Sequence, residues 1–121
     1  MKKDKTLILG ASEEPSRYSH MAIRMLRKHG CPVVAIGRKA GQVEDVTIET
    51  GTPLREDIDT VTLYMNPVHQ RPLLEWIIAL APRRIIYNPG TENPELQALA
   101  SARQIENLEA CTLVMLSTGA Y

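Results

Sequence analysis

Short hydrophobic runs alternate along the chain with longer amphipathic segments. Four of these runs predict buried strands, at residues 6–9, 33–36, 60–64 and 84–87. Residues 19–29 carry apolar side chains at helical spacing and end at Gly30, which suits a left-handed helix terminus. Alternation of this kind is typical of βαβ units and predicts a parallel sheet with helices on both faces.

Two Asn-Pro pairs mark further helix starts. Asparagine caps a helix and proline suits the first helical position, so Asn66 with Pro67 and Asn93 with Pro94 each predict a helix. Pro72 would remove a hydrogen bond inside the first of these helices. The regular part of that helix is therefore expected to begin at Pro72.

Two segments have less distinct patterns. Residues 41–53 are mostly polar or β-branched and predict a loop with a short extended piece. In the tail, residues 105–108 predict a fifth strand, and residues 112–116 fit either a strand or a packing helix. Five strands with three or four helices form a compact, doubly wound α/β sheet in which each βαβ crossover is right-handed.

Length and charge narrow the class of protein. At 121 residues the chain is about one domain, so residues 1–121 are expected to form a single domain. Lys and Arg number 14, and Asp and Glu also number 14, which argues against a nucleic-acid partner because such proteins carry a basic excess. Cys31 and Cys111 lack metal-type spacing and are expected to be reduced thiols. No apolar stretch suits a signal peptide or a membrane helix, so a cytoplasmic protein without a membrane partner is expected.

The turn after the first strand carries the strongest candidate chemistry. It begins with Gly10, which lets the backbone turn tightly and approach a ligand closely. Free amides at the next helix start attract phosphate, Ser12 and Ser19 supply hydroxyl donors, and Arg17 can pair with an anion. A plain turn with serine caps would give the same pattern, and the G-x-G-x-x-G fingerprint is absent.

Charged residues near this turn affect whether it can bind phosphate and which nucleotide it favours. Glu13 and Glu14 would repel phosphate unless their side chains point away. After the second strand, Arg38 and Lys39 follow Gly37, where a site for NAD would place an acidic residue. Two cations suit a phosphorylated ribose, as in NADP or the 3′-phosphorylated end of coenzyme A, and disfavour NAD.

Polar residues also follow the third and fourth strands. Asn88, Pro89 and Gly90 form a rigid turn beside the expected cleft, where the asparagine side chain could line a ligand. Asn66 lies in the corresponding place after the third strand. His69 is a candidate acid–base group, although a surface or capping role is the commoner one for a lone histidine.

Recognisable catalytic motifs are absent. The sequence contains no H-E-x-x-H, nucleophile elbow or Walker lysine, and no acid pair with catalytic spacing. Cys111 could be a nucleophile, but its apolar neighbours suggest packing. No catalytic or metal site is therefore expected.

Three pieces of the chain resemble the small bacterial CoA-binding domain family, whose members are stand-alone relatives of the nucleotide-binding domain of the succinyl-CoA synthetase alpha subunit. The pieces are the first turn, residues 88–93 and residues 111–116. The resemblance implies a Rossmann-like fold with five parallel strands in the order 3-2-1-4-5 and a coenzyme A site at the first turn. Relatives usually continue the second strand into an Asn-Pro pair, where this chain has Gly37 and Arg38.

The resemblance also implies which residues hold phosphate. Carried over by position, they are Gly10, Ala11, Ser12, Arg17 and Ser19. The leading hypothesis is a module that binds coenzyme A or an acyl-CoA without catalysing a reaction. One alternative is an NADP-dependent or CoA-using enzyme with His69 or Cys111 in the chemistry. Another is an interaction protein that keeps the fold without a ligand.

Overall fold

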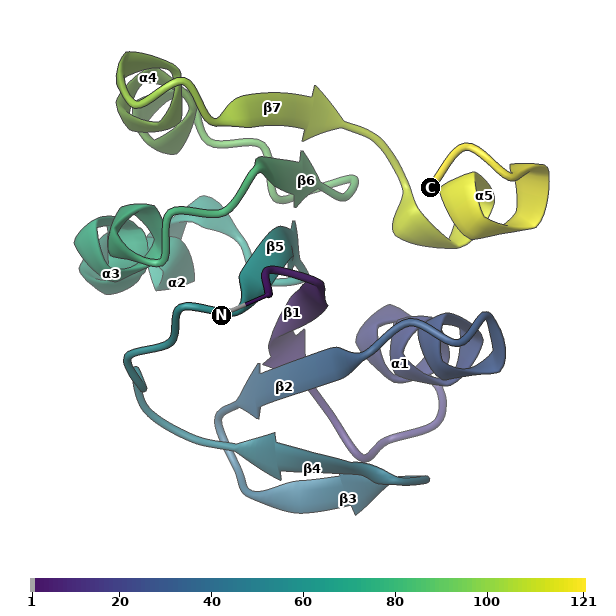
Figure 1. Cartoon of the computed structure of the whole chain (residues 1–121). Coiled ribbons are helices and arrows are strands. Elements are labelled where there is room, and N and C mark those ends of the chain that lie inside the picture. The colour runs from purple at the N-terminus through teal and green to yellow at the C-terminus, as the bar shows by residue number, and fades with distance from the viewer. Residues whose placement is uncertain (1) are drawn as a thin grey trace.

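The computed structural model describes residues 2–121 and shows an α/β fold built on a seven-stranded sheet (Figure 1). The strand order is β3-β4-β2-β1-β5-β6-β7, and every neighbouring pair is parallel except β3 with β4. The strands are β1 (Lys5–Ala11), β2 (Val33–Gly37), β3 (Gly41–Val43), β4 (Val46–Glu49), β5 (Ile58–Leu63), β6 (Arg84–Tyr87) and β7 (Glu106–Glu109).

Helices cover both faces of this sheet, as the sequence predicts. On one face lie α1 (Tyr18–Lys28) and α5 (Thr112–Thr118). On the other lie α2 (Pro67–Gln70), a 3₁₀ turn η1 (Arg71–Leu73), α3 (Leu74–Ala79) and α4 (Pro94–Ala102) (Figure 1).

The central strand β1 contributes to a core on each face. Leu7 and Leu9 join the cluster beneath α3 and α4, whereas Ile8 joins the cluster beneath α1. Successive side chains of a strand point to opposite faces, so a strand covered on both sides reads as a continuous apolar run. This is why the hydrophobic pattern locates β1 correctly.

Both predicted Asn-Pro helix starts are confirmed. The side-chain oxygen of Asn66 accepts a hydrogen bond from the backbone N–H of His69 at 3.1 Å. That of Asn93 accepts from the N–H groups of Glu95 and Leu96. Pro72 lies in the 3₁₀ turn, and the regular helix resumes two residues later.

The predicted strand number and strand order are wrong. The predicted third strand, now β5, pairs with β1 and β6 and not with β2. The strand beside β2 is β4, which lies in the segment expected to be a loop with one short extended piece. Its Val46 and Ile48 are buried while Thr47 and Glu49 are exposed, so this four-residue strand has only two apolar residues to mark it in the sequence.

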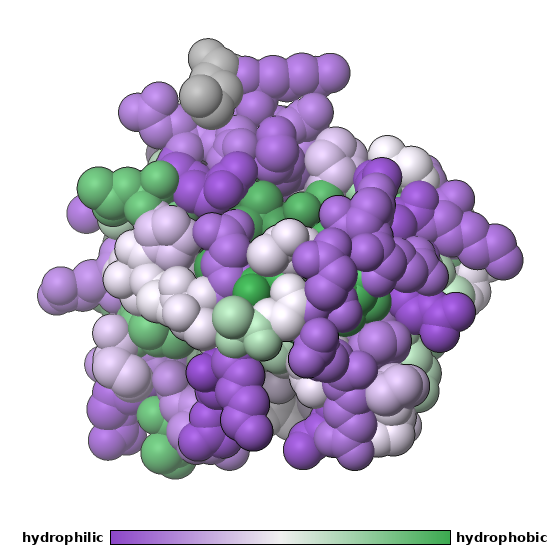
Figure 2. Space-filling view, turned by 90° about the horizontal axis from the view of Figure 1, so that it is seen from below, coloured by the Kyte–Doolittle hydropathy of each residue, from purple (hydrophilic) through white to green (hydrophobic). Residues whose placement is uncertain are grey.

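The β3–β4 hairpin covers one edge of the sheet with polar side chains. Viewed from this side, the surface is mostly hydrophilic, and hydrophobic residues appear only as small separate areas (Figure 2). Edge strands commonly carry polar side chains that discourage pairing with other chains. Among the described residues 2–121, no helix is both long and apolar enough to cross a membrane.

Candidate functional site

A cleft of about 1090 Å³ lies at the carboxyl ends of β1, β2 and β5. This is where an open parallel sheet normally binds its ligand, and the volume is at the upper end of the usual range for small-molecule sites. Most of the predicted site residues come together in its wall: Gly10, Ala11, Ser12, Arg17, Ser19, Gly37, Arg38, Asn66 and Pro89. The structure does not bring Asn88 and Gly90 into this wall.

Two glycines allow the strand ends around the cleft to approach one another. Gly10 has a φ of 104°, and a Cβ there would lie 3.0 Å from the backbone carbon of Tyr64. A Cβ on Gly37 would lie only 2.4 Å from the carbonyl oxygen of Ala11. Both residues are therefore required first by close backbone packing within the chain.

The first turn leaves the amino end of α1 without a side-chain cap. Arg17 occupies the capping position with an extended backbone, but its side chain makes no capping hydrogen bond. The Ser12 hydroxyl instead accepts the Glu14 N–H at 3.0 Å, and the Ser12 carbonyl lies 3.1 Å from Nδ1 of His20. The amide groups that open this 11-residue helix provide a favourable environment for an anion.

Both acidic residues of the turn are held by other groups of the chain. Glu13 accepts the Gln42 backbone N–H at 2.8 Å. Glu14 accepts the Ser16 hydroxyl at 3.0 Å and the Arg17 Nε at 3.2 Å, and these contacts, Ser16 first, lower its pKa. The pairing partly neutralises Arg17, whose side chain is 68% exposed.

Arg38 and Lys39 form the most available positive charge in the cleft. Both are exposed and line it, and neither forms an ion pair with any residue in 2–121. By contrast, Arg24 and Arg27 on α1 each pair with a carboxylate of the β3–β4 turn. The cleft therefore combines free cations with an uncapped helix start, an arrangement suited to a phosphorylated ligand.

Asn88 has a structural role that the sequence does not reveal. Its side-chain nitrogen donates to the Thr62 hydroxyl at 2.7 Å and to the Leu63 carbonyl at 2.9 Å. Its side-chain oxygen accepts the Thr112 N–H at 2.9 Å. Asn88 thus links the ends of β5 and β6 to the start of α5, while Gly90 lies exposed in the following turn with a φ of 92°.

Two tyrosines that sequence reasoning missed lie at the cleft. Tyr18 is 70% exposed at the start of α1, and Tyr64 directly follows β5. Burial raises the pKa of Tyr64 to about 12, against the opposing effect of the nearby Thr62 and Thr112 hydroxyls. Those two hydroxyls bond each other at 2.8 Å, and the buried Tyr64 hydroxyl has no hydrogen-bond partner within residues 2–121.

Only one feature of the sequence points to Tyr64 as a site residue. It follows a buried strand at the edge where ligands bind, as Asn66 does two residues later. His69 also lines the cleft, but Cys111 lies in an adjoining cavity. Within the described part of the chain, no group of three or more His, Cys, Asp or Glu residues could hold a metal ion.

These features define a mostly parallel α/β protein with an anion-suited cleft at the carboxyl ends of its strands. The chain belongs to the CoA binding domain family, because residues 4–117 match the model of that family. The predicted resemblance to the CoA-binding domain family is thereby confirmed. Among curated proteins, no sequence matches the chain significantly.

Solved structures with the same fold extend over nearly the whole chain. A crystal structure of an uncharacterized protein is 46% identical, with a TM-score of 0.94 and full coverage of both chains. A protein from Thermus thermophilus is 20% identical, with a TM-score of 0.85, over 98% of this chain and 91% of its own. A hypothetical protein from Pyrococcus horikoshii is 20% identical, with a TM-score of 0.83, over 97% and 83%.

Proposed function

We propose that this chain binds coenzyme A in the cleft at the carboxyl ends of β1, β2 and β5. Membership of the CoA binding domain family supports this ligand. The observation that carries the proposal is the pair of free cations, Arg38 and Lys39, in the same cleft as the uncapped start of α1. Coenzyme A carries a diphosphate and a separate ribose phosphate, so it needs two anion-binding places.

The two places suit different parts of the ligand. The first turn, with Ser12, Ser19 and the α1 amides, suits the diphosphate. Arg38 and Lys39 follow the second strand, where α/β nucleotide sites contact the ribose, and they suit its 3′-phosphate. The pantetheine arm then extends from the first turn toward Tyr64 and Asn66 on the opposite side of the cleft.

The contacts of the two acidic residues in the first turn bear on whether the diphosphate can lie there. Glu13 is held by the backbone of Gln42, and Glu14 by Ser16 and Arg17. Both acids line the cleft, and Arg17 partly compensates the charge of Glu14, whereas the Gln42 amide holds Glu13 in place without neutralising it. A charge-assisted hydrogen bond contributes about 1.5–3 kcal/mol, so one lost phosphate contact corresponds to about a tenfold or larger loss of affinity.

NADP is the second candidate, because its 2′-phosphate suits the same two cations. Calorimetric titration with coenzyme A, dephospho-CoA, NADPH and NADH separates the ligands. We expect coenzyme A to bind and dephospho-CoA to bind about tenfold more weakly. Stronger binding of NADPH than of coenzyme A would reverse the choice, and NADPH turnover that disappears in His69→Ala would establish an enzyme.

Arg38→Ala tests the predicted contact. It should weaken coenzyme A about tenfold and leave dephospho-CoA unchanged, because only the former carries the 3′-phosphate. Arg103→Ala is a matched control, since Arg103 is also exposed and lies after α4, outside the cleft. Equal losses with both ligands would remove Arg38 from the phosphate site. Absence of binding by all four nucleotides would contradict the proposal and favour an interaction protein.

A further inference from the structure

A second cavity, of about 290 Å³, adjoins the cleft beside the ends of β5, β6 and β7. Tyr18, Tyr64 and Pro89 line both spaces, so the two meet at these side chains. The remaining wall comes from Asn88, Cys111 and Leu113, and the surface is mostly apolar. The phosphate and ribose groups of coenzyme A do not call for such a lining.

The place of this cavity matches one end of the proposed ligand. Arg38 and Lys39 lie at one end of the cleft, after β2, and the first turn lies beside them, after β1. The cavity lies on the other side of β1, past β5. A ligand with its phosphates at β1 and β2 therefore has its thiol end nearest to Tyr64 and the cavity.

We infer that this cavity is an acyl pocket, and that the ligand of the chain is the thioester of coenzyme A with a short apolar acyl group. This inference rests on the proposed coenzyme A site. It adds the class of acyl group and assigns Cys111 and Leu113 to the wall that surrounds it.

The volume limits the length of the acyl chain. An apolar cavity of about 150 Å³ in another protein holds one benzene molecule, which has six carbon atoms. The present cavity is roughly twice as large, and the thioester group with the end of the pantetheine arm would take about half of that space, so an acyl chain of about four to six carbons fits in the rest. A chain of twelve carbons would extend beyond it into solvent.

Calorimetric titration of the full chain, under reducing conditions, compares coenzyme A with acetyl-, butyryl-, hexanoyl- and dodecanoyl-CoA. Burying one methylene group contributes about fourfold in affinity. Butyryl-CoA, with two more methylenes than acetyl-CoA, should therefore bind about fifteenfold more tightly than acetyl-CoA, and the gain should stop near hexanoyl-CoA. Equal affinities for coenzyme A and butyryl-CoA would overturn the acyl pocket while leaving the coenzyme A site intact. No binding of coenzyme A itself would refute both.

Leu113→Phe tests the wall of the cavity directly. The added ring should remove the roughly fifteenfold gain of butyryl-CoA over acetyl-CoA and leave the affinity for coenzyme A unchanged. Val114→Phe is the control, because Val114 is the next residue of α5 and is 58% exposed. If Leu113→Phe lowers the melting temperature, Cys111→Leu replaces it as the test. Cys111 lines the same cavity from the β7–α5 connection, so the larger side chain reduces the same space. A butyryl-CoA gain that persists in both Leu113→Phe and Cys111→Leu would place the acyl group elsewhere.

Discussion

The two ends of the sheet treat their charges differently. At the amino ends of β1, β5 and β6, the charged side chains pair with one another. At the carboxyl ends of β1 and β2, two cations line a cleft and have no carboxylate partner among the described residues. Asp57, before β5, contacts Arg55 at 2.7 Å and Lys5 at 3.2 Å. Arg38 and Lys39, after β2, have no such contact within residues 2–121. The same sheet thus carries a compensated end and an uncompensated one.

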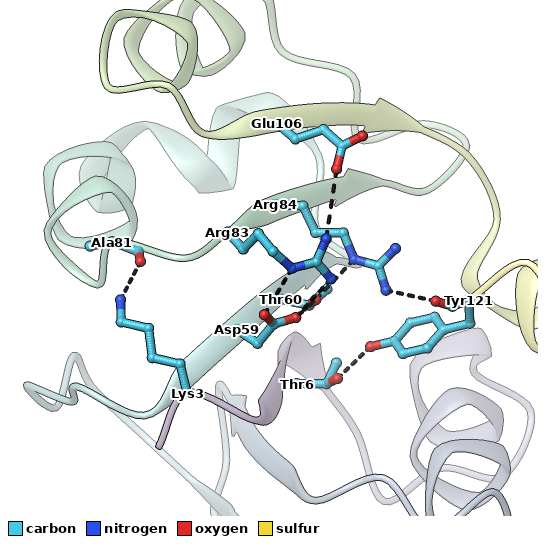
Figure 3. A network of polar contacts seen from close by, with 9 residues as sticks. All are labelled: Lys3, Thr6, Asp59, Thr60, Ala81, Arg83, Arg84, Glu106 and Tyr121. Carbon is cyan, nitrogen blue, oxygen red and sulfur yellow. Dashed lines mark hydrogen bonds and ion pairs between the residues drawn. The ribbon is translucent and has the colours of Figure 1, made fainter. Parts of the chain in front are cut away.

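The compensated end also holds the last residue of the chain in place. Arg83 pairs with Asp59, and the buried Arg84 donates to the Thr60 hydroxyl at 3.0 Å (Figure 3). The Arg84 guanidinium lies 4.5 Å from the centre of the Tyr121 ring and also donates to the Tyr121 main-chain oxygen. Figure 3 shows these side chains converging from β5, the start of β6 and the C-terminus.

The difference indicates what each end contributes. Paired and hydrogen-bonded groups avoid the cost of burying unsatisfied charge, and they stabilise the folded chain. Cations without a carboxylate partner among the described residues contribute nothing comparable until a ligand supplies the missing partner. Sites of this kind are where proteins depart from local rules for the sake of function. Substitutions at the two ends should therefore affect different quantities.

The largest expected effect comes from the backbone packing that shapes the cleft. Gly37→Ala would place a methyl group 2.4 Å from the Ala11 carbonyl oxygen, so the ends of β1 and β2 must separate. We expect a loss of about 3 kcal/mol in the free energy of unfolding, measured by urea denaturation. Gly51→Ala is the control: nothing lies within 4 Å of its new Cβ, and its positive φ costs only about 1 kcal/mol. Similar losses in the two variants would show that the β1–β2 contact is not tight.

At the compensated end, Asp57→Asn should cost about 2 kcal/mol at pH 7. The hydrogen bond from Arg55, followed by that from Lys5, lowers the pKa of Asp57 to about 2, against a desolvation effect that raises it. Because the folded pKa lies below the ordinary value of 3.8, this stabilisation is present above about pH 4 and is lost as the pH falls toward 2.

Urea unfolding at several pH values tests this prediction for Asp57. Wild type and Asp57→Asn should differ at pH 7 and converge near pH 2. Asp45→Asn removes an exposed partner of Arg27 and should change stability little. A difference between wild type and Asp57→Asn that stays constant from pH 7 to pH 2 would contradict the assignment.

At the uncompensated end, charge removal should affect binding without affecting stability. The double variant Arg38→Ala with Lys39→Ala should leave the unfolding free energy unchanged and weaken coenzyme A at least tenfold. The matched control, Arg103→Ala with Lys28→Ala, removes two exposed cations outside the cleft. If the control weakens coenzyme A equally, the cations act only through net charge.

Local signals in the sequence predict much of this arrangement. The Asn66 and Asn93 caps depend on residues within three positions, and Arg38 is recognisable because it follows a clearly buried strand. The β3–β4 hairpin escapes prediction because its two strands bury only Val43, Val46 and Ile48. Short one-sided strands give a weak periodic signal.

The missed parts of the site depend on contacts between distant segments. Asn88 looks like a ligand-lining residue in the sequence, and it does line the second cavity, but its side chain is bonded to Thr62 and Thr112, which are 26 and 24 residues away. Tyr64 appears to be the end of a strand, and only the fold places it against Tyr18 and Cys111. No local pattern encodes such neighbours, so composition and periodicity cannot reveal them.

The smallest expected effect is a gain. Glu14 pairs with Arg17 through a 3.2 Å contact, so Arg17→Ala alone removes a cation that is already partly neutralised. Glu14→Gln removes the carboxylate charge and should release Arg17 toward phosphate, so coenzyme A should bind about threefold more tightly at low salt. The pKa of Glu14 is lowered, first by the Ser16 hydroxyl and then by Arg17, so the carboxylate is charged in wild type at neutral pH.

The gain should shrink in 0.5 M salt, because exposed charges are screened. In the double variant Glu14→Gln with Arg17→Ala the gain should be largely lost. Weaker binding by Glu14→Gln would instead mean that Glu14 orders the first turn through Ser16, and that the acidic residue supports the phosphate site.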